Sequence, residues 1–339
     1  MNLNQKNIKN YITKTVLPTL AFSEYTISDV SEVTDQTYVN WIYKVELKKA
    51  DDKQIIYLRQ TRDHVKKKPD IKMDATRIKF EVDILNLLQK IIPNITPKVL
   101  FFDKDNNVAV LDDIKRNGKL LVHELLAGRP HPESGNFFGE IIAKIHGQTL
   151  DISHKKVRGN KKENDDAVKF HLGMRLGPAL KMYPKETNIF LQISKKARTS
   201  LVLGDMASKN IFIDKTKVRF LDLERAFVGD PAFDLAFLFC HYLIEVPPDS
   251  ITKSIKFIDN FMNSYKKKMK EYLTDKEIKQ LENRVIRFLG ITILYRLYGF
   301  YLVINVEQDE KIWKSTAYKM LTDKKSNLLS IVLLKLNFV

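Results

Sequence analysis

The pattern of apolar and polar positions divides the chain into a first third of short alternating segments and a remainder of longer amphipathic ones. Apolar and polar residues alternate from Tyr25 to about Leu58, and Asp51-Asp52 interrupts the alternation, which predicts a strand, a turn and a second strand. A second pair of strands is expected at 98–102 and 108–111. Between the two pairs, apolar residues recur every three or four positions from 73 to 91, which predicts an amphipathic helix. This part of the chain therefore indicates a small sheet with one helix.

Longer periodic stretches follow a polar segment at 115–118, which places an expected domain boundary near Ile114. Residues 151–170 carry many charges and are expected to be mobile or loop-like, as a solvated insertion or as a lid. A short hairpin is expected from 210–214 and 218–223. The other periodic stretches predict helices at 120–126, 132–150, 233–245, 250–272, 276–306 and 310–336.

Polar residues stand at both ends of the expected hairpin. Asp205 and Asn210 precede its first strand, and Asp222 and Glu224 follow its second. Antiparallel strands would bring the two ends side by side and gather three carboxylates and an amide. In phosphoryl transfer one Asp orients a hydroxyl, while an Asn and a second Asp hold magnesium ions on the nucleotide phosphates. The alternative is a hairpin whose acidic ends are simply solvated.

A longer motif surrounds the hairpin. It comprises Gly204-Asp205, Asn210, Asp222-Leu223-Glu224 and the run from Gly229 to Ala236, which reads GDPAFDLA. This order resembles the aminoglycoside phosphotransferase and choline kinase type of small-molecule kinases, which includes the methylthioribose kinases. Their motif runs H-G-D-x4-N, then I-D-x-E, then G-D-P-x-x-D-L-A. The chain departs from it at Leu203, where the family usually has His.

The resemblance implies an α+β, two-lobed fold of the protein-kinase type. Residues 1–114 would form an N-lobe, with a small antiparallel sheet and one helix that bind nucleotide. Residues 115–339 would form a mainly helical C-lobe with the catalytic loop, the metal site and the acceptor-binding region. ATP and Mg²⁺ are the implied cofactors, with ATP between the lobes.

The resemblance also assigns roles in the C-lobe. Asp205 would orient the acceptor hydroxyl. Asn210 and Asp222 would hold magnesium, with Glu224 as a second metal contact. Two further residues would support the catalytic loop, each with a simpler alternative: Asp234 is also a natural cap near a helix start, and His146 also fits a core or helix-end histidine.

In the N-lobe, Arg59 occupies the strand position where such kinases carry a Lys on the α- and β-phosphates, and Arg62 is the nearest competitor. A guanidinium can bind phosphate through two donors, whereas Lys acts as a point charge. Glu81, on the predicted helix, resembles the glutamate that pairs with the strand cation. Its alternative is a solvated helix glutamate.

Three further residues are expected at the nucleotide. Asn40 begins the segment that matches the end of the family's phosphate loop, although Asp35-Gln36-Thr37 stands where that loop has glycines. Asp112 and Asp113 follow the second strand pair, at the position that resembles the adenine-binding hinge.

Composition excludes several other classes. A single cysteine, Cys240, excludes an internal disulfide and a Cys-based zinc site and suits the cytoplasm, where we expect the protein. The N-terminus lacks the pattern of a signal peptide. The apolar stretch 288–306 favours a buried helix over a membrane span because Arg296 lies at its middle. The formal charge of +16 is spread along the chain, which favours a solvated basic surface and leaves a nucleic-acid partner as the alternative.

The sequence therefore predicts an ATP-dependent kinase that phosphorylates a hydroxyl of a small metabolite. A protein kinase would need a long peptide platform, whereas only twelve positions separate Asp222 from Asp234. The second hypothesis is a weak or inactive kinase-like module that binds nucleotide or nucleic acid. Choline-like alcohols, methylthioribose-like sugars, amino alcohols and aminoglycosides all remain open as acceptors, and so does the oligomeric state.

Overall fold

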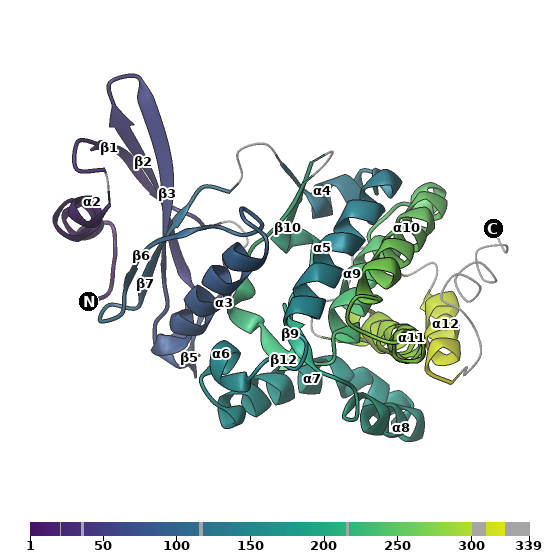
Figure 1. Cartoon of the computed structure of the whole chain (residues 1–339). Helices are drawn as coiled ribbons and strands as arrows, with labels where there is room; N and C mark the ends of the chain where they lie inside the picture. The colour runs from purple at the N-terminus through teal and green to yellow at the C-terminus, as the bar shows by residue number, and fades with distance from the viewer. Residues whose placement is uncertain (21, 35–36, 115–117, 215–216, 300–309, 323–339) are drawn as a thin grey trace. The chain divides into compact units, whose positions relative to one another are not determined.

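The computed structural model describes residues 1–20, 22–34, 37–114, 118–214, 217–299 and 310–322. The chain divides into two compact units, Met1–Arg116 (unit 1) and Asn117–Val339 (unit 2). Unit 1 is built on an antiparallel sheet and unit 2 is mainly helical (Figure 1).

The sheet of unit 1 has five strands in the order β1-β2-β3-β7-β6, and every neighbouring pair is antiparallel. Both expected strand pairs are confirmed, because β2 pairs with β3 and β6 pairs with β7. A tight turn joins β2 to β3, and Ala50 in this turn has a φ of 50°. The alternating stretch also contains an extra strand, β1, that the sequence did not separate from β2. The strands are β1 Thr26–Glu32, β2 Trp41–Lys49, β3 Asp52–Gln60, β6 Val99–Asp103 and β7 Val108–Asp112.

Helices and a short hairpin complete unit 1. Side chains such as Ile8 and Ile12 from its N-terminal helical turns join Val45 and Leu58 of the sheet in one buried cluster. The amphipathic helix is confirmed, but a 3₁₀ turn capped by Asp74 precedes it. The elements are α1 Ile8–Tyr11, the π-helical turn η1 Ile12–Val16, α2 Leu17–Thr19, β4 His64–Val65, β5 Lys68–Lys72, η2 Ala75–Arg77 and α3 Ile78–Ile91.

Unit 2 contains two small sheets. The expected hairpin is confirmed as β10 (Ile211–Ile213) and β11 (Val218–Phe220), to which β8 (Lys119–Leu120) adds a third strand. Residues 215 and 216 of its turn lie outside the described ranges. In the second sheet, β9 (Ser200–Val202) pairs with β12 (Phe227–Gly229). This pairing brings the segments before Asp205 and after Glu224 together.

The helices of unit 2 confirm most of the periodic stretches. The expected continuations at 299–306 and 323–336 fall partly or wholly on residues that the structure does not describe. The helices are α4 Leu121–Leu126, α5 Gly135–Gln148, α6 His154–Arg158, α7 Lys161–Met182, α8 Pro184–Ser194, α9 Ala232–Ile244, α10 Ile251–Met269, α11 Asp275–Tyr298 and α12 Glu310–Thr322. Short 3₁₀ turns are η3 Pro132–Ser134, η4 Ser208–Asn210, η5 Leu223–Arg225 and η6 Pro248–Ser250.

The expectation of a mobile or loop-like segment at 151–170 is wrong, because α6 and the first half of α7 lie there. Ser153 and Asn160 cap the two helices through their side chains. The charges that suggested a loop are spaced as helical ion pairs, Lys161 with Asp165 and Lys162 with Asp166. Such i,i+4 pairs stabilise an exposed helix instead of unfolding it.

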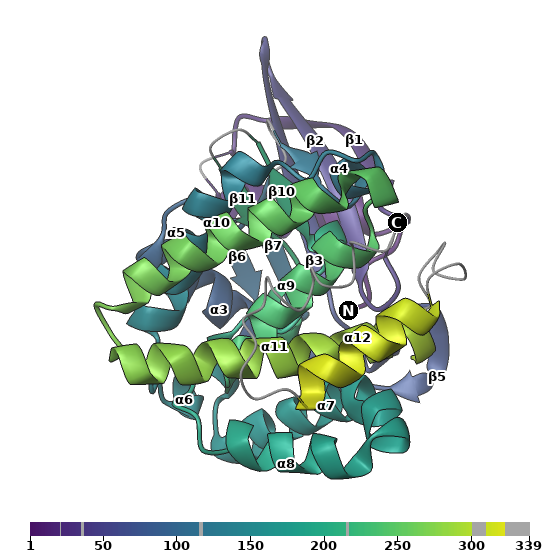
Figure 2. The same ribbon diagram turned by 90° about the vertical axis from the view of Figure 1, so that its right-hand side faces the viewer.

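Helix α9 forms the centre of unit 2, and every one of its thirteen residues is buried. Helix α5 lies along α10, and a Cβ on Gly139 would stand 2.3 Å from the carbonyl oxygen of Phe261, so the two backbones approach closely (Figure 1). Helix α11 contacts α9 on one side and α12 on another (Figure 2). No helix in the described part of the chain is long and apolar enough to cross a membrane.

Candidate active site

Asp234 fixes the backbone that precedes Asp205. Its Oδ2 accepts a hydrogen bond from the Leu203 N–H at 2.6 Å, and its Oδ1 accepts one from the Gly204 N–H at 3.0 Å. His146 lies 3.3 Å from Oδ2 through its Nε2, and its Nδ1 lies 2.9 Å from the Tyr265 hydroxyl. Asp234 and His146 are fully buried. Asp234 therefore contacts the backbone before Asp205 directly, whereas His146 contacts Asp234 and Tyr265.

Gly204 lets the chain turn immediately before Asp205. Its φ is +80°, and a Cβ at this position would lie 2.3 Å from the carbonyl oxygen of Arg225. Only glycine adopts this left-handed conformation without cost and also tolerates the close approach. The side chain of Leu203, where the family has His, is buried in the core.

Asp205 and Asn210 lie together. The Asn210 amide nitrogen donates to the Asp205 backbone oxygen at 3.1 Å and to its carboxylate at 3.3 Å. The turn η4 between them positions Asn210 for these contacts.

An arginine that the sequence did not single out also contacts Asp205. Arg175 of α7 donates from Nη2 to the Asp205 carboxylate at 3.2 Å, and its side chain is only 4% exposed. Its guanidinium packs over the rings of Phe237 and Phe233, at 4.3 and 5.1 Å from their centroids. Desolvation, partly offset by the Asp205 charge, lowers the pKa of Arg175. In the sequence, Arg175 lies among small and apolar residues in the run LGMRLGPAL. This pattern indicates that the arginine is buried, but it does not indicate that Asp205 is its partner.

Asp222 stands at the junction of β11 and η5 in a left-handed conformation, with φ and ψ both 58°. Two side chains from the α6 and α7 region hold the segment after it. Arg158 donates to the backbone oxygens of Glu224 and Ala226, each at 2.6 Å. Asn164 bonds to both the N–H and the carbonyl of Val228. These two helices thus support the segment that carries Glu224, one of the expected metal ligands.

The expected metal site has an oxygen-only donor set: the Asn210 amide and the carboxylates of Asp222 and Glu224. Hard oxygen ligands of this kind suit magnesium, which usually keeps several waters and binds substrate phosphates. Nowhere in the described ranges do three or more carboxylate, imidazole or thiolate groups gather to hold a metal. The expected cluster of three carboxylates is therefore not assembled as a metal cage, and the amide and substrate oxygens would have to complete the coordination.

In unit 1, Arg59 and Glu81 form a buried ion pair. The Arg59 Nε lies 3.0 Å from Glu81 Oε2, and the two residues are 7% and 3% exposed. The pair joins β3 to the first turn of α3. Arg62, the competing residue, instead packs over the Trp41 ring and donates to the Leu3 backbone oxygen.

Asn40 and Asp112, also expected at the nucleotide, make structural contacts. The Asn40 amide oxygen accepts a hydrogen bond from Arg77 at 2.6 Å. Asp112 closes the end of β7 by accepting a hydrogen bond from the Lys98 N–H at 2.6 Å. Asp113 follows directly in the chain, and of the expected phosphate loop 35–37 the structure describes only Thr37.

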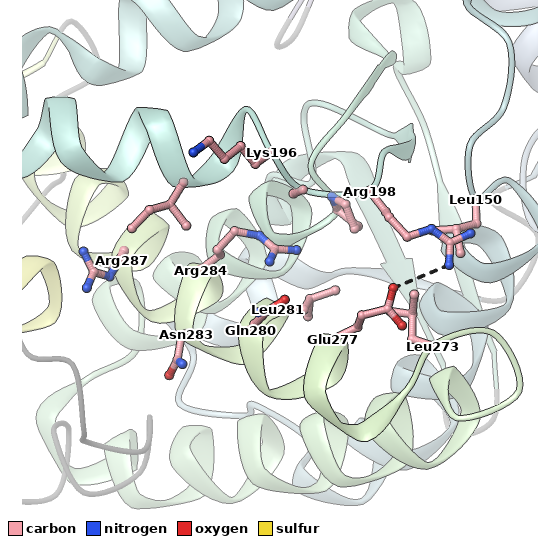
Figure 3. Close-up of a pocket in the computed structure, with 13 residues that line it drawn as sticks. Leu150, Lys196, Arg198, Leu273, Glu277, Gln280, Leu281, Asn283, Arg284 and Arg287 are labelled. Carbon is pink, nitrogen blue, oxygen red and sulfur yellow. Dashed lines mark ion pairs between the residues drawn. The ribbon is translucent and has the colours of Figure 1, made fainter.

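The described residues of unit 2 line at least two pockets. A pocket of about 230 Å³ adjoins Asp205 and is lined by side chains from η4, α9 and α11. A larger one, of about 520 Å³, is lined by α11 and by residues near the end of α8, and contains none of the expected catalytic residues (Figure 3). Of these two pockets, the smaller one adjoins Asp205.

An antiparallel sheet with a buried Arg–Glu pair, together with a helical unit that presents an Asp–Asn loop, defines a kinase-like α+β protein. The model of the phosphotransferase enzyme family matches residues 54–266, so the chain belongs to that family. The family and the fold class expected from the motifs are thus confirmed.

Individual relatives are distant. A methylthioribose kinase of Geobacillus kaustophilus is 23% identical over 194 residues, which are 50% of this chain and 49% of that protein. The chain therefore matches about half the length of this curated relative. A Plasmodium vivax ethanolamine kinase is similar in structure, with a TM-score of 0.55 and 12% identity over 99% of this chain and 90% of that one.

Two further structures share the fold. The ADP-bound aminoglycoside phosphotransferase APH(2'')-Ib has a TM-score of 0.52 and 13% identity, over 94% of this chain and 99% of that one. A choline kinase of Cryptosporidium parvum has a TM-score of 0.50 and 12% identity, over 98% and 94%. At these identities the likeness establishes the fold and leaves the substrate open.

Proposed function

We propose that this protein is an ATP-dependent small-molecule kinase that transfers the γ-phosphate of ATP to a hydroxyl group. The observation that carries the proposal is the arrangement around Asp205. Its loop is fixed from behind by Asp234, and Asn210 bonds to its carboxylate. A carboxylate held in this way can orient a hydroxyl for in-line attack and receive its proton.

The other residues have complementary roles in this proposal. Arg59, kept in place by Glu81, binds the nucleotide phosphates, because a guanidinium offers two donors to phosphate oxygens. Asn210 and Asp222 would hold magnesium, with Glu224 as a further contact, and the bound ion would supply positive charge to the phosphate oxygens. Asp234 and His146 act only through the loop they support.

One observation favours a second candidate, a nucleotide-binding module with little turnover. The carboxylate of Asp205 is already paired with Arg175, which is buried and unable to move into solvent without losing its contacts with Phe233 and Phe237. An acceptor must compete with this ion pair for Asp205.

A phosphorylation assay separates the two candidates. The protein is incubated with labelled ATP, magnesium and a pool of metabolites, and the product is identified by mass. We expect Asp205→Asn to lower kcat by about 10²- to 10⁴-fold, the usual contribution of a positioned proton acceptor. Asp249→Asn, which removes an exposed carboxylate, is the matched control and should retain full activity.

ATP binding is measured in parallel by calorimetry. If the wild type and Asp205→Asn both bind ATP and are equally inactive over the whole pool, the kinase proposal fails and the binding module takes its place.

A further inference from the structure

The pocket beside Asp205 has an unusual balance of charge. It lies wholly within unit 2, and its four basic side chains outnumber its two acidic ones. The basic residues are Arg175, Lys209, Arg225 and Arg296, and the acidic ones are Asp205 and Glu245. Building on the proposed function, we propose that this pocket receives the acceptor and that the acceptor carries an acidic group, a carboxylate or a phosphate, besides its hydroxyl.

Both acidic side chains are already engaged. Glu245 lies 2.7 Å from Nδ1 of His241 and 2.9 Å from Nη2 of Arg296, and it also accepts a hydrogen bond from Ser208. Burial alone would raise the pKa of Glu245, but these partners outweigh it and lower the pKa. Asp205 is paired with Arg175. In the described lining, both carboxylates are therefore already paired with basic side chains, and neither is left to bind an ammonium group.

Several buried donors in the same lining lack an acceptor. Within the described part of the chain, Nε and Nη1 of Arg175 and Nε of Arg296 have no hydrogen-bond partner. A buried donor without an acceptor is destabilising, and more so when it is charged. The two oxygens of a carboxylate, or those of a phosphate, match the donor pattern of a guanidinium. An acidic group in this pocket would meet guanidinium groups whose donors the protein itself does not fully satisfy.

Basic residues also stand where an incoming ligand would meet them first. Lys209 is exposed on η4 between Asp205 and Asn210, and Arg225 is partly exposed. Positive charge around a recess attracts anions and repels cations before contact. An acceptor with an ammonium group would meet like charge at the entrance and paired carboxylates inside, so the pocket selects against amines.

Binding of four small alcohols of similar size tests this inference. Glycerol is the neutral member, glycerate carries a carboxylate, glycerol phosphate carries a phosphate, and serinol carries an amine. Binding to the full chain is measured by calorimetry at constant ionic strength. We expect at least one of the two anions to bind about tenfold more tightly than glycerol and serinol. Whichever anion binds more tightly indicates the acidic group.

Variants locate the binding. Lys209→Met removes an exposed cation of the pocket, so it should fold normally and weaken binding of the anion about threefold or more. Arg175→Met should weaken it further. Arg287→Met is the matched control, because Arg287 lines the larger pocket in Figure 3 and its loss should leave the affinity unchanged.

Three results would overturn the inference: serinol binding as tightly as the tighter of the two anions, no anion binding better than glycerol, or anion affinity unchanged in both Lys209→Met and Arg175→Met. The phosphorylation assay keeps the proposed function separate. Phosphorylation of amine-bearing acceptors in preference to acidic ones would sustain the kinase and refute the acidic acceptor. Anion binding at this pocket with no Asp205-dependent transfer to any acceptor would refute the kinase.

Discussion

The carboxylate of Asp234 accepts a hydrogen bond from the backbone N–H of Gly204 at 3.0 Å, across thirty positions of the chain. With the bond to Leu203, both carboxylate oxygens hold the two residues that precede Asp205. The position of the proposed catalytic carboxylate thus depends on a fully buried residue of α9.

Replacing Asp234 should therefore affect both stability and rate. In Asp234→Asn, the amide NH₂ must face one of the two backbone N–H groups, so one buried donor loses its acceptor. We expect the free energy of unfolding to fall by about 1–3 kcal/mol. We also expect kcat to fall while KM for ATP changes little. Urea denaturation and initial rates measure the two effects, with Asp166→Asn on the exposed face of α7 as control. An unchanged kcat would show that the loop does not need this support.

Gly204→Ala should be costly because the left-handed backbone and the nearby Arg225 carbonyl both oppose a Cβ. The conformation alone costs about 1–2 kcal/mol in an L-residue, before any steric clash. Gly173→Ala is the matched control, since Gly173 is exposed within α7 and a Cβ there would meet nothing within 4 Å. That change should stabilise the protein by about 0.5–1 kcal/mol. Thermal unfolding of both variants tests the contrast, and equal effects would contradict it.

The Arg59–Glu81 pair should behave as a unit. Removing one partner leaves the other charge buried, so Arg59→Met and Glu81→Leu should each destabilise the protein by about 3–5 kcal/mol. The double variant should lose much less than the sum, because no unpaired charge remains. Denaturant unfolding of the wild type, the two single variants and the double variant gives the coupling free energy between Arg59 and Glu81. Additive losses in unfolding free energy would argue against the ion pair. The double variant should also have a raised KM for ATP, because it lacks the proposed phosphate ligand.

Glu124 of α4 should make stability depend on pH. Hydrogen bonds from Arg129, and secondarily from His131, lower the pKa of this carboxylate from 4.5 to about 2. Because the folded-state pKa is lowered, the stabilisation is fully present above pH 4.5 and is lost as the pH falls towards about 2. The advantage of the wild type over Glu124→Gln in unfolding free energy should shrink over that range. Glu133→Gln, at an exposed position, is the control. A difference that does not vary with pH would refute the assignment.

The sequence by itself determined many of the elements and their order. Alternation revealed β2 and β3, and the three- and four-residue period revealed α3, because these periods follow from local backbone geometry. The motif residues from Asp205 to Asp234 also indicated the family. Their order and spacing along the chain can be read from the sequence, even though the fold brings them together only in space. The prediction failed where the composition was ambiguous. The charged residues at the start of α7 predicted a loop, but in the structure they form ion pairs along a helix.

Only the tertiary structure decided which distant side chains meet. It brought Arg175 to Asp205, Arg158 to the segment after Asp222, and Arg296 to Glu245. It also engaged Asn40 and Asp112 in contacts with Arg77 and Lys98. Such pairs join elements whose packing depends on the whole core, so no periodicity in a single sequence encodes them. The charge of the pocket beside Asp205 arises in the same way, from basic residues on α7, η4, η5 and α11 that the fold gathers in one pocket with Asp205 and Glu245.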